Sequence, residues 1–198
     1  MRKGFLVAVL IINAFALAAL YSANLEQAKR SGKTVLPVYG QVGDFALLDQ
    51  NQSEVTRQTL SGKPWIANFM FSRCAGACPV MSVKMGGFQK SLGHIRLVSF
   101  SVDPERDSPA ALAEYAKKYA AESGRWFFLT GSKETLNNVS NSVHLGSLGD
   151  LGMHSLRFVL VDADSNIRGY YDSTDAKSIQ KLLHDAKRLD ARSSRSAI

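Results

Sequence analysis

Short segments rich in apolar residues recur along the chain at the length of β-strands. We predict buried strands over 65–71, 95–102, 126–129, 156–161 and 167–171. The polar residues between the last two segments are typical of a tight turn, which makes this pair a hairpin. Two shorter segments, 42–48 and 54–60, predict a small hairpin before the main sheet.

Helical patterns fill the gaps between these strands. A helix is expected over 80–89, and another after Ser108-Pro109, where serine caps the helix and proline takes its first position. Ser132 starts a third helix, and a final amphipathic helix brings apolar residues from Ile179 to Leu189 onto one face. Strands that alternate with helices, followed by a hairpin and a terminal helix, predict an α/β sandwich.

The only two cysteines, Cys74 and Cys78, stand where the first of these strands gives way to a helix. Pro79 predicts that the helix begins there, with Cys78 at its N-cap and Cys74 in the loop before it. Gly76 allows the loop to fold back, so that the two sulfur atoms converge. The helix N-terminus favours the thiolate form, which suits soft-metal binding or redox chemistry. A cysteine pair at a strand-to-helix junction makes the specific prediction a thioredoxin-like fold.

The start of the chain has the pattern of a membrane segment. Arg2 and Lys3 precede an apolar run from Phe5 to Leu20, interrupted only by Asn13. This run is short for a membrane span and long for the core of a signal peptide. We predict an uncleaved anchor, with a cleaved signal peptide as the alternative. The positive-inside rule then places the rest of the chain on the extracytoplasmic side of the membrane.

The distribution of charge agrees with a protein held at a membrane. The formal net charge is +7, but the positive excess lies in residues 1–36 and 187–198, and the part between them is neutral. A neutral body with basic ends favours a membrane-proximal protein over one that binds nucleic acid. The expected organisation is a membrane anchor over 1–23, a basic linker over 24–37, a folded domain over 38–190 and a disordered tail over 191–198.

Two thiolates supply two soft ligands, and copper(I) or zinc needs at least one more. His154 is the best candidate, because it lies in a glycine-rich loop before the strand at 156–161, and in a thioredoxin-like fold this loop faces the cysteines. Two sulfurs and one nitrogen suit copper, whereas a structural zinc site normally has four protein ligands. The other three histidines have ordinary assignments: His94 at the end of a helix, His144 at the surface and His184 within the terminal helix. Met81 and Met85 are assigned to core packing.

The chain resembles the Sco/SenC family of copper-binding, membrane-anchored thioredoxin-like proteins. The resemblance covers about 42–183 and rests on four blocks in order: Cys74-Ala75-Gly76-Ala77-Cys78-Pro79, Ser101-Val102-Asp103-Pro104-Glu105-Arg106-Asp107, Thr130-Gly131 and His154-Ser155. It implies that Cys74, Cys78 and His154 bind the metal. Residues 103–107 are otherwise explained by turn and helix-start chemistry. Met153 stands where the family usually carries an aspartate, which places a carboxylate partner for His154 in doubt.

The family resemblance implies one of two functions at the inner membrane, with a single span and the folded domain on the periplasmic side. The first is a copper metallochaperone that delivers copper, as Cu(I) or Cu(II), to the dinuclear copper site in subunit II of cytochrome c oxidase. The second is a thiol-disulfide reductase that keeps the acceptor cysteines reduced, for which Cys74 and Cys78 suffice. The two functions are compatible, so an enzymatic role is left open. His154 separates them, since a reductase has no stated use for it.

Overall fold

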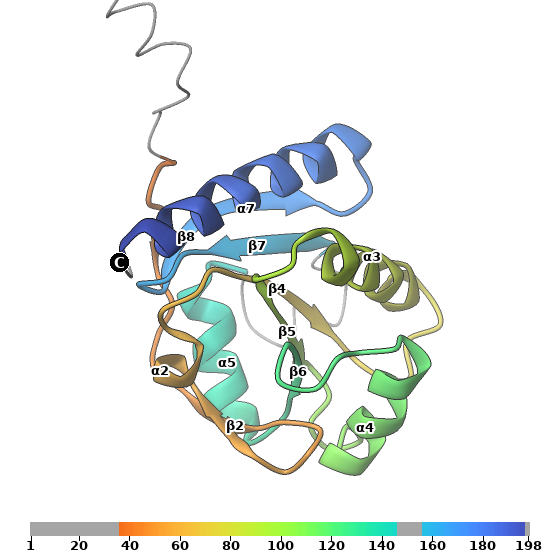
Figure 1. Ribbon diagram of the computed structural model, residues 1–198. Coiled ribbons are helices and arrows are strands. Elements are labelled where there is room, and N and C mark those ends of the chain that lie inside the picture. Colours follow the sequence, from red (N-terminus) through yellow and green to blue (C-terminus); the bar gives the residue numbers. More distant parts are fainter. Residues whose placement is uncertain (1–35, 146–155, 197–198) are drawn as a thin grey trace, which may run out of the picture. The chain divides into compact units, whose positions relative to one another are not determined.

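The computed structural model describes residues 36–145 and 156–196, with side chains as far as Ala191 (Figure 1). Its main element is a six-stranded sheet of order β1-β8-β7-β4-β5-β6. The strands of this sheet are β1 Gly40–Gln41, β4 Trp65–Met70, β5 Arg96–Ser101, β6 Trp126–Leu129, β7 Arg157–Val161 and β8 Asn166–Asp172. A separate antiparallel pair, β2 (Ala46–Leu48) and β3 (Glu54–Thr56), confirms the predicted N-terminal hairpin.

Strand β4 lies at the centre of the main sheet. It pairs in parallel with β5, which pairs in parallel with β6, and it pairs in the antiparallel sense with β7. Every residue of β4 is buried, as expected for a strand covered on both faces. Its side chains alternate, so that Ile66 and Met70 enter one core while Trp65 and Phe69 enter the other.

Helices cover both faces of the sheet. They are α2 Arg57–Leu60, α3 Ala77–Ser91, α4 Pro109–Lys118, α5 Lys133–Ser142 and α7 Ala176–Ser196. Helices α3, α4 and α7 enclose one core, and α2, α5 and the β2–β3 hairpin enclose the other. Figure 1 shows α3 and α4 on the side of the sheet away from α2 and α5. Ser108 and Ser132 accept bonds from the amides of Ala111 and Thr135, which confirms the two predicted serine caps.

Three sequence-based boundaries are wrong. The second strand of the small hairpin ends at Thr56, and residues 57–60, expected to continue it, form helix α2, which Thr56 caps. Helix α3 begins at Ala77 with Gly76 as its N-cap, so Cys78 is the second helical residue and not the cap. The amides of the first helical turn have no partner within the helix, so proline is tolerated in that turn and does not mark the cap. The predicted disordered tail is wrong as far as Ser196, because α7 continues to that residue. Nothing after Gly169 in the chain is glycine or proline, so no residue type that breaks helices ends α7 at Ala191.

Within the described part of the chain, no helix has the length and apolar character to cross a membrane. The predicted anchor over 1–23 and almost all of the basic linker over 24–37 lie outside the described residues.

Candidate metal centre

Cys74 and Cys78 lie at the carboxyl end of the central strand β4, as predicted. Cys74 belongs to the cysteine loop, defined here as residues 71–76, and its amide donates to the carbonyl of Phe71 at 3.2 Å. Cys78 lies in the first turn of α3 and is only 8% exposed, whereas Cys74 is half-buried. Both are free thiols. The loop packs closely, since a Cβ atom on Gly76 would stand 4.0 Å from the Cys74 sulfur.

The two thiols differ in acidity. Partial burial acts to raise the pKa of Cys74, but the thiol of Cys78 and the amides of Cys78, Gly76 and Ala77 outweigh it and lower that pKa. Burial, together with the neighbouring Cys74 sulfur, raises the pKa of Cys78 to about 12. The helix N-terminus therefore favours the thiolate at Cys74 and not at Cys78. Cys74 is therefore the more accessible and the more nucleophilic of the two sulfurs, and Cys78 keeps its proton at neutral pH.

Cys74 and Cys78 are the only thiol ligands that the described residues supply. His154, the predicted third ligand, lies outside the described residues. In the part of the chain that the structure describes, no group of three or more His, Cys, Asp or Glu side chains is arranged to hold a metal ion. His94 and His184 are exposed, and His144 lies against Gly40 at the end of α5. None of these three histidines joins the cysteines, which agrees with their ordinary assignments.

The two methionines near the cysteines belong to the core. Met81 is 2% exposed and Met85 is fully buried, and both pack in the cluster beneath α3. The prediction that they serve core packing is confirmed.

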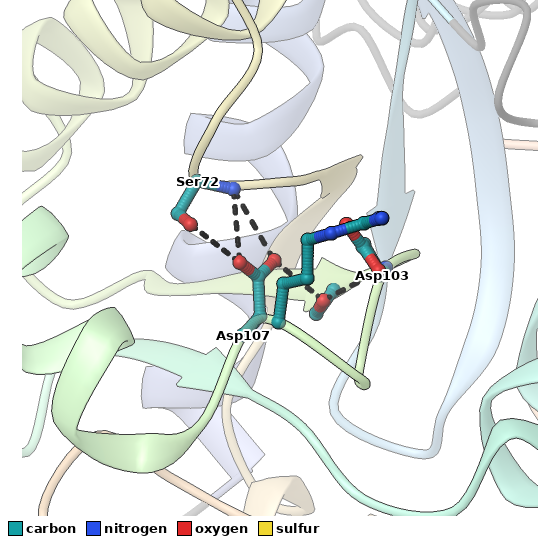
Figure 2. A network of polar contacts seen from close by, with 5 residues as sticks. Ser72, Asp103 and Asp107 are labelled. Atoms are coloured by element: carbon teal, nitrogen blue, oxygen red, sulfur yellow. Dashed lines mark hydrogen bonds and ion pairs between the residues drawn. The ribbon is translucent and has the colours of Figure 1, made fainter.

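Asp107 supports the cysteine loop from a distant part of the chain. Its carboxylate is fully buried and accepts bonds from the Ser72 amide at 3.2 Å and the Ser72 hydroxyl at 2.5 Å (Figure 2). The hydroxyl of Ser101 donates to its second oxygen at 2.7 Å. Asp107 thereby ties the segment just before Cys74 to the connection between β5 and α4.

The sequence did not predict this role of Asp107. Turn chemistry was expected for residues 103–107, and it holds for Asp103, whose carboxylate pairs with Arg106 at 3.0 Å near the surface. The signal that was available is the pair of short polar side chains, Ser72 and Ser101, directly at the ends of two neighbouring buried strands. Parallel strands β4 and β5 bring these ends together, so a single carboxylate can serve both.

The SCO1/SenC family model matches residues 37–189, which is most of the chain. This chain belongs to the SCO1/SenC family. It is 30% identical over 161 residues to the SCO1 protein homolog of Bacillus subtilis, which covers 76% of this chain and 83% of that protein.

Two solved structures show the same fold. BsSco, a member of the Sco family of cytochrome c oxidase assembly proteins, matches with a TM-score of 0.70 and 27% identity over 80% of this chain and 99% of its own. Yeast Sco1 with copper bound matches with a TM-score of 0.62 and 24% identity over 75% of this chain and 89% of its own. The thioredoxin-like prediction is therefore confirmed. Copper, the metal expected from the donor set, is the metal in the yeast structure.

Proposed function

We propose that this SCO1/SenC family protein carries copper and delivers it to the dinuclear copper site in subunit II of cytochrome c oxidase. Cys74 and Cys78 supply two sulfur ligands, and His154 supplies a nitrogen ligand. Two thiolates and one imidazole suit trigonal copper(I), and copper(II) with a further ligand. Residues 1–23 anchor the protein in the inner membrane, and the folded domain acts on the periplasmic side.

The unequal environments of the two sulfur atoms carry this proposal. Cys74 is half-exposed and has a lowered pKa, so it is the first sulfur that an incoming copper ion meets. Cys78 is buried with a pKa raised to about 12, so copper must displace its proton to bind there. An acceptor thiol can compete for the metal from the exposed side of Cys74. Such a site suits a carrier, which must release its metal, better than a closed structural site.

The surroundings of β7 support His154 as the third ligand. Strand β7 is antiparallel to β4, with Ala67 opposite Val159. The first residues of β7 therefore lie beside the last residues of β4, at the same end of the sheet. Leu156, two residues after His154, and Cys74 both pack against the same core cluster. Two extended residues span at most about 7 Å, and this short separation in sequence supports His154 as a ligand at this end of the sheet.

A thiol-disulfide reductase is the second candidate, and the difference in pKa between the two cysteines favours it. The Cys74 thiolate attacks a partner disulfide and forms a mixed disulfide, releasing one partner thiolate. Cys78 then loses its proton and attacks the Cys74 sulfur, which releases the second partner thiolate. The partner disulfide is thereby reduced to two thiols, and this chain is left with a Cys74–Cys78 disulfide. Copper delivery needs reduced acceptor thiols, so both activities fit one protein.

The test is an anaerobic copper(I) titration of the detergent-solubilised full chain, with metal counted per chain, alongside the rate of disulfide reduction. We expect His154→Ala to lower copper(I) affinity at least about tenfold and to leave most of the reductase rate. His94→Ala is the matched control, because His94 is exposed beyond the C-terminal end of α3, and it should change neither quantity. An unchanged copper affinity in His154→Ala would remove the metal assignment and leave the reductase as the function.

A further inference from the structure

Helix α3 exposes an apolar stripe that starts at the cysteines. Val80 is 57% exposed and Val83 is 65% exposed, although both lie on a helix that packs its other side into the core. Gly76 and Gly87, also exposed, fall on the same side, since at about 100° per residue these four positions lie within about 60° of arc. Gly76, Val80, Val83 and Gly87 are called the α3 stripe below. It is about 16 Å long at 1.5 Å per residue.

The α3 stripe is continuous with the reactive sulfur. A Cβ atom on Gly76, at the head of the stripe, would stand only 4.0 Å from the Cys74 sulfur. A thiol that forms a disulfide with Cys74 must bring its own backbone within about 7 Å of the Cys74 backbone. A thiol that takes copper from Cys74 must likewise bring its sulfur into contact with the ion held there. A partner protein that does either covers surface next to Cys74, and the first turns of α3 are part of that surface.

The charged residues of the cysteine loop and of α3 itself are of one sign. Residues 71–91 include Arg73, Lys84 and Lys90 and no aspartate or glutamate. Arg73 and Lys90 are exposed at the two ends of the stripe, while the ammonium group of Lys84 donates to the carbonyl of Ser173. An apolar strip between two exposed cations is complementary to an apolar surface with carboxylates at its rim.

We propose that the α3 stripe is the docking surface for the thiol-bearing copper acceptor, and that the acceptor presents an apolar surface rimmed by acidic side chains. This inference rests on the proposed function, because it names the surface by which that acceptor is recognised. In the docked complex, acceptor sulfurs replace Cys74 and Cys78 on the copper ion one at a time. The protons that the acceptor thiols lose pass to the two cysteines, and no electron is transferred. Docking on α3 makes this exchange fast without making copper binding tighter.

The test measures copper(I) transfer from the loaded, detergent-solubilised full chain to the purified periplasmic domain of cytochrome c oxidase subunit II. The variant is Val80→Glu with Val83→Glu, which places two like charges against an acidic rim. We expect the second-order transfer rate to fall at least about tenfold, the effect of losing contacts at the centre of an interface. Copper(I) affinity should stay within about twofold, since both side chains are exposed to solvent and neither is a proposed copper ligand.

Two matched variants complete the design. Val38→Glu introduces the same charge at an equally exposed valine, 58% exposed beside strand β1, and should transfer copper at the wild-type rate. Val80→Lys with Val83→Lys should lower the rate less than the glutamate pair does. Transfer by the glutamate pair at the wild-type rate would overturn the docking surface, and an equal loss in the lysine pair would overturn the acidic rim. If the wild-type protein passes no copper to subunit II, the proposed function itself fails, which is a different result.

Discussion

Removing the Asp107 carboxylate should loosen the cysteine loop and destabilise the fold together. In Asp107→Ala, the Ser101 hydroxyl, which is fully buried, loses its acceptor with no access to water. A lost bond to a charged acceptor costs about 1.5–3 kcal/mol. Ser72 is half-buried, so water can replace the carboxylate there in part, at a cost of about 1 kcal/mol. We expect the free energy of unfolding of the reduced protein to fall by about 3 kcal/mol, and by about half as much in Asp107→Asn.

The assay combines urea unfolding with copper(I) titration. A loop that is no longer held at Ser72 should bind copper(I) about tenfold more weakly, as found when groups that orient metal ligands are removed. Asp103→Ala is the control from the same segment, because it removes only the Asp103–Arg106 pair near the surface and should cost under about 1 kcal/mol. The reasoning is refuted if Asp107→Ala is no less stable than Asp103→Ala, or if it loses stability but binds copper as tightly as the wild type.

Three further predictions concern the thiols and the membrane. The pKa of Cys74 is lowered and that of Cys78 is raised to about 12, so iodoacetamide at pH 7 should label Cys74 alone. Mass analysis of the peptides measures the labelling, and equal labelling of both cysteines would contradict the assigned acidities. The raised pKa of Cys78 means that this thiol ionises first in the unfolded chain. The stability that it contributes is therefore complete below about pH 9 and declines towards pH 12. Because the pKa values of Tyr115 and Tyr171 are raised as well, Cys78→Ser should show a smaller decline in pH-dependent urea unfolding, and an equal decline would contradict the assigned acidity. A reporter fused after Ile198 should be active only outside the cytoplasm and stay in the membrane fraction, and release of a form without residues 1–23 would count against the anchor.

The sequence alone determined the elements whose signals are local. Strand β4 was predicted from a continuous apolar run, and the starts of α4 and α5 from Ser108-Pro109 and Ser132, because burial pattern and capping act over a few residues. The cysteine pair was located by the same local signals, a strand that ends and a helix that begins. The family resemblance then pointed to the same fold and metal.

The tertiary structure decided what depends on contacts between distant segments. Asp107 holds Ser72 across 35 positions of sequence, and only the parallel pairing of β4 with β5 brings them together. The opposite pKa shifts of Cys74 and Cys78 also depend on the folded structure. The Cys78 thiol and the amides of the first turn of α3 lower the pKa of Cys74, whereas burial raises that of Cys78, and no spacing of cysteines encodes this difference. The tertiary structure also decided the exposure of Val80 and Val83. A valine on a helix is expected in the core, and only the packing of α3 shows that this side of the helix faces water.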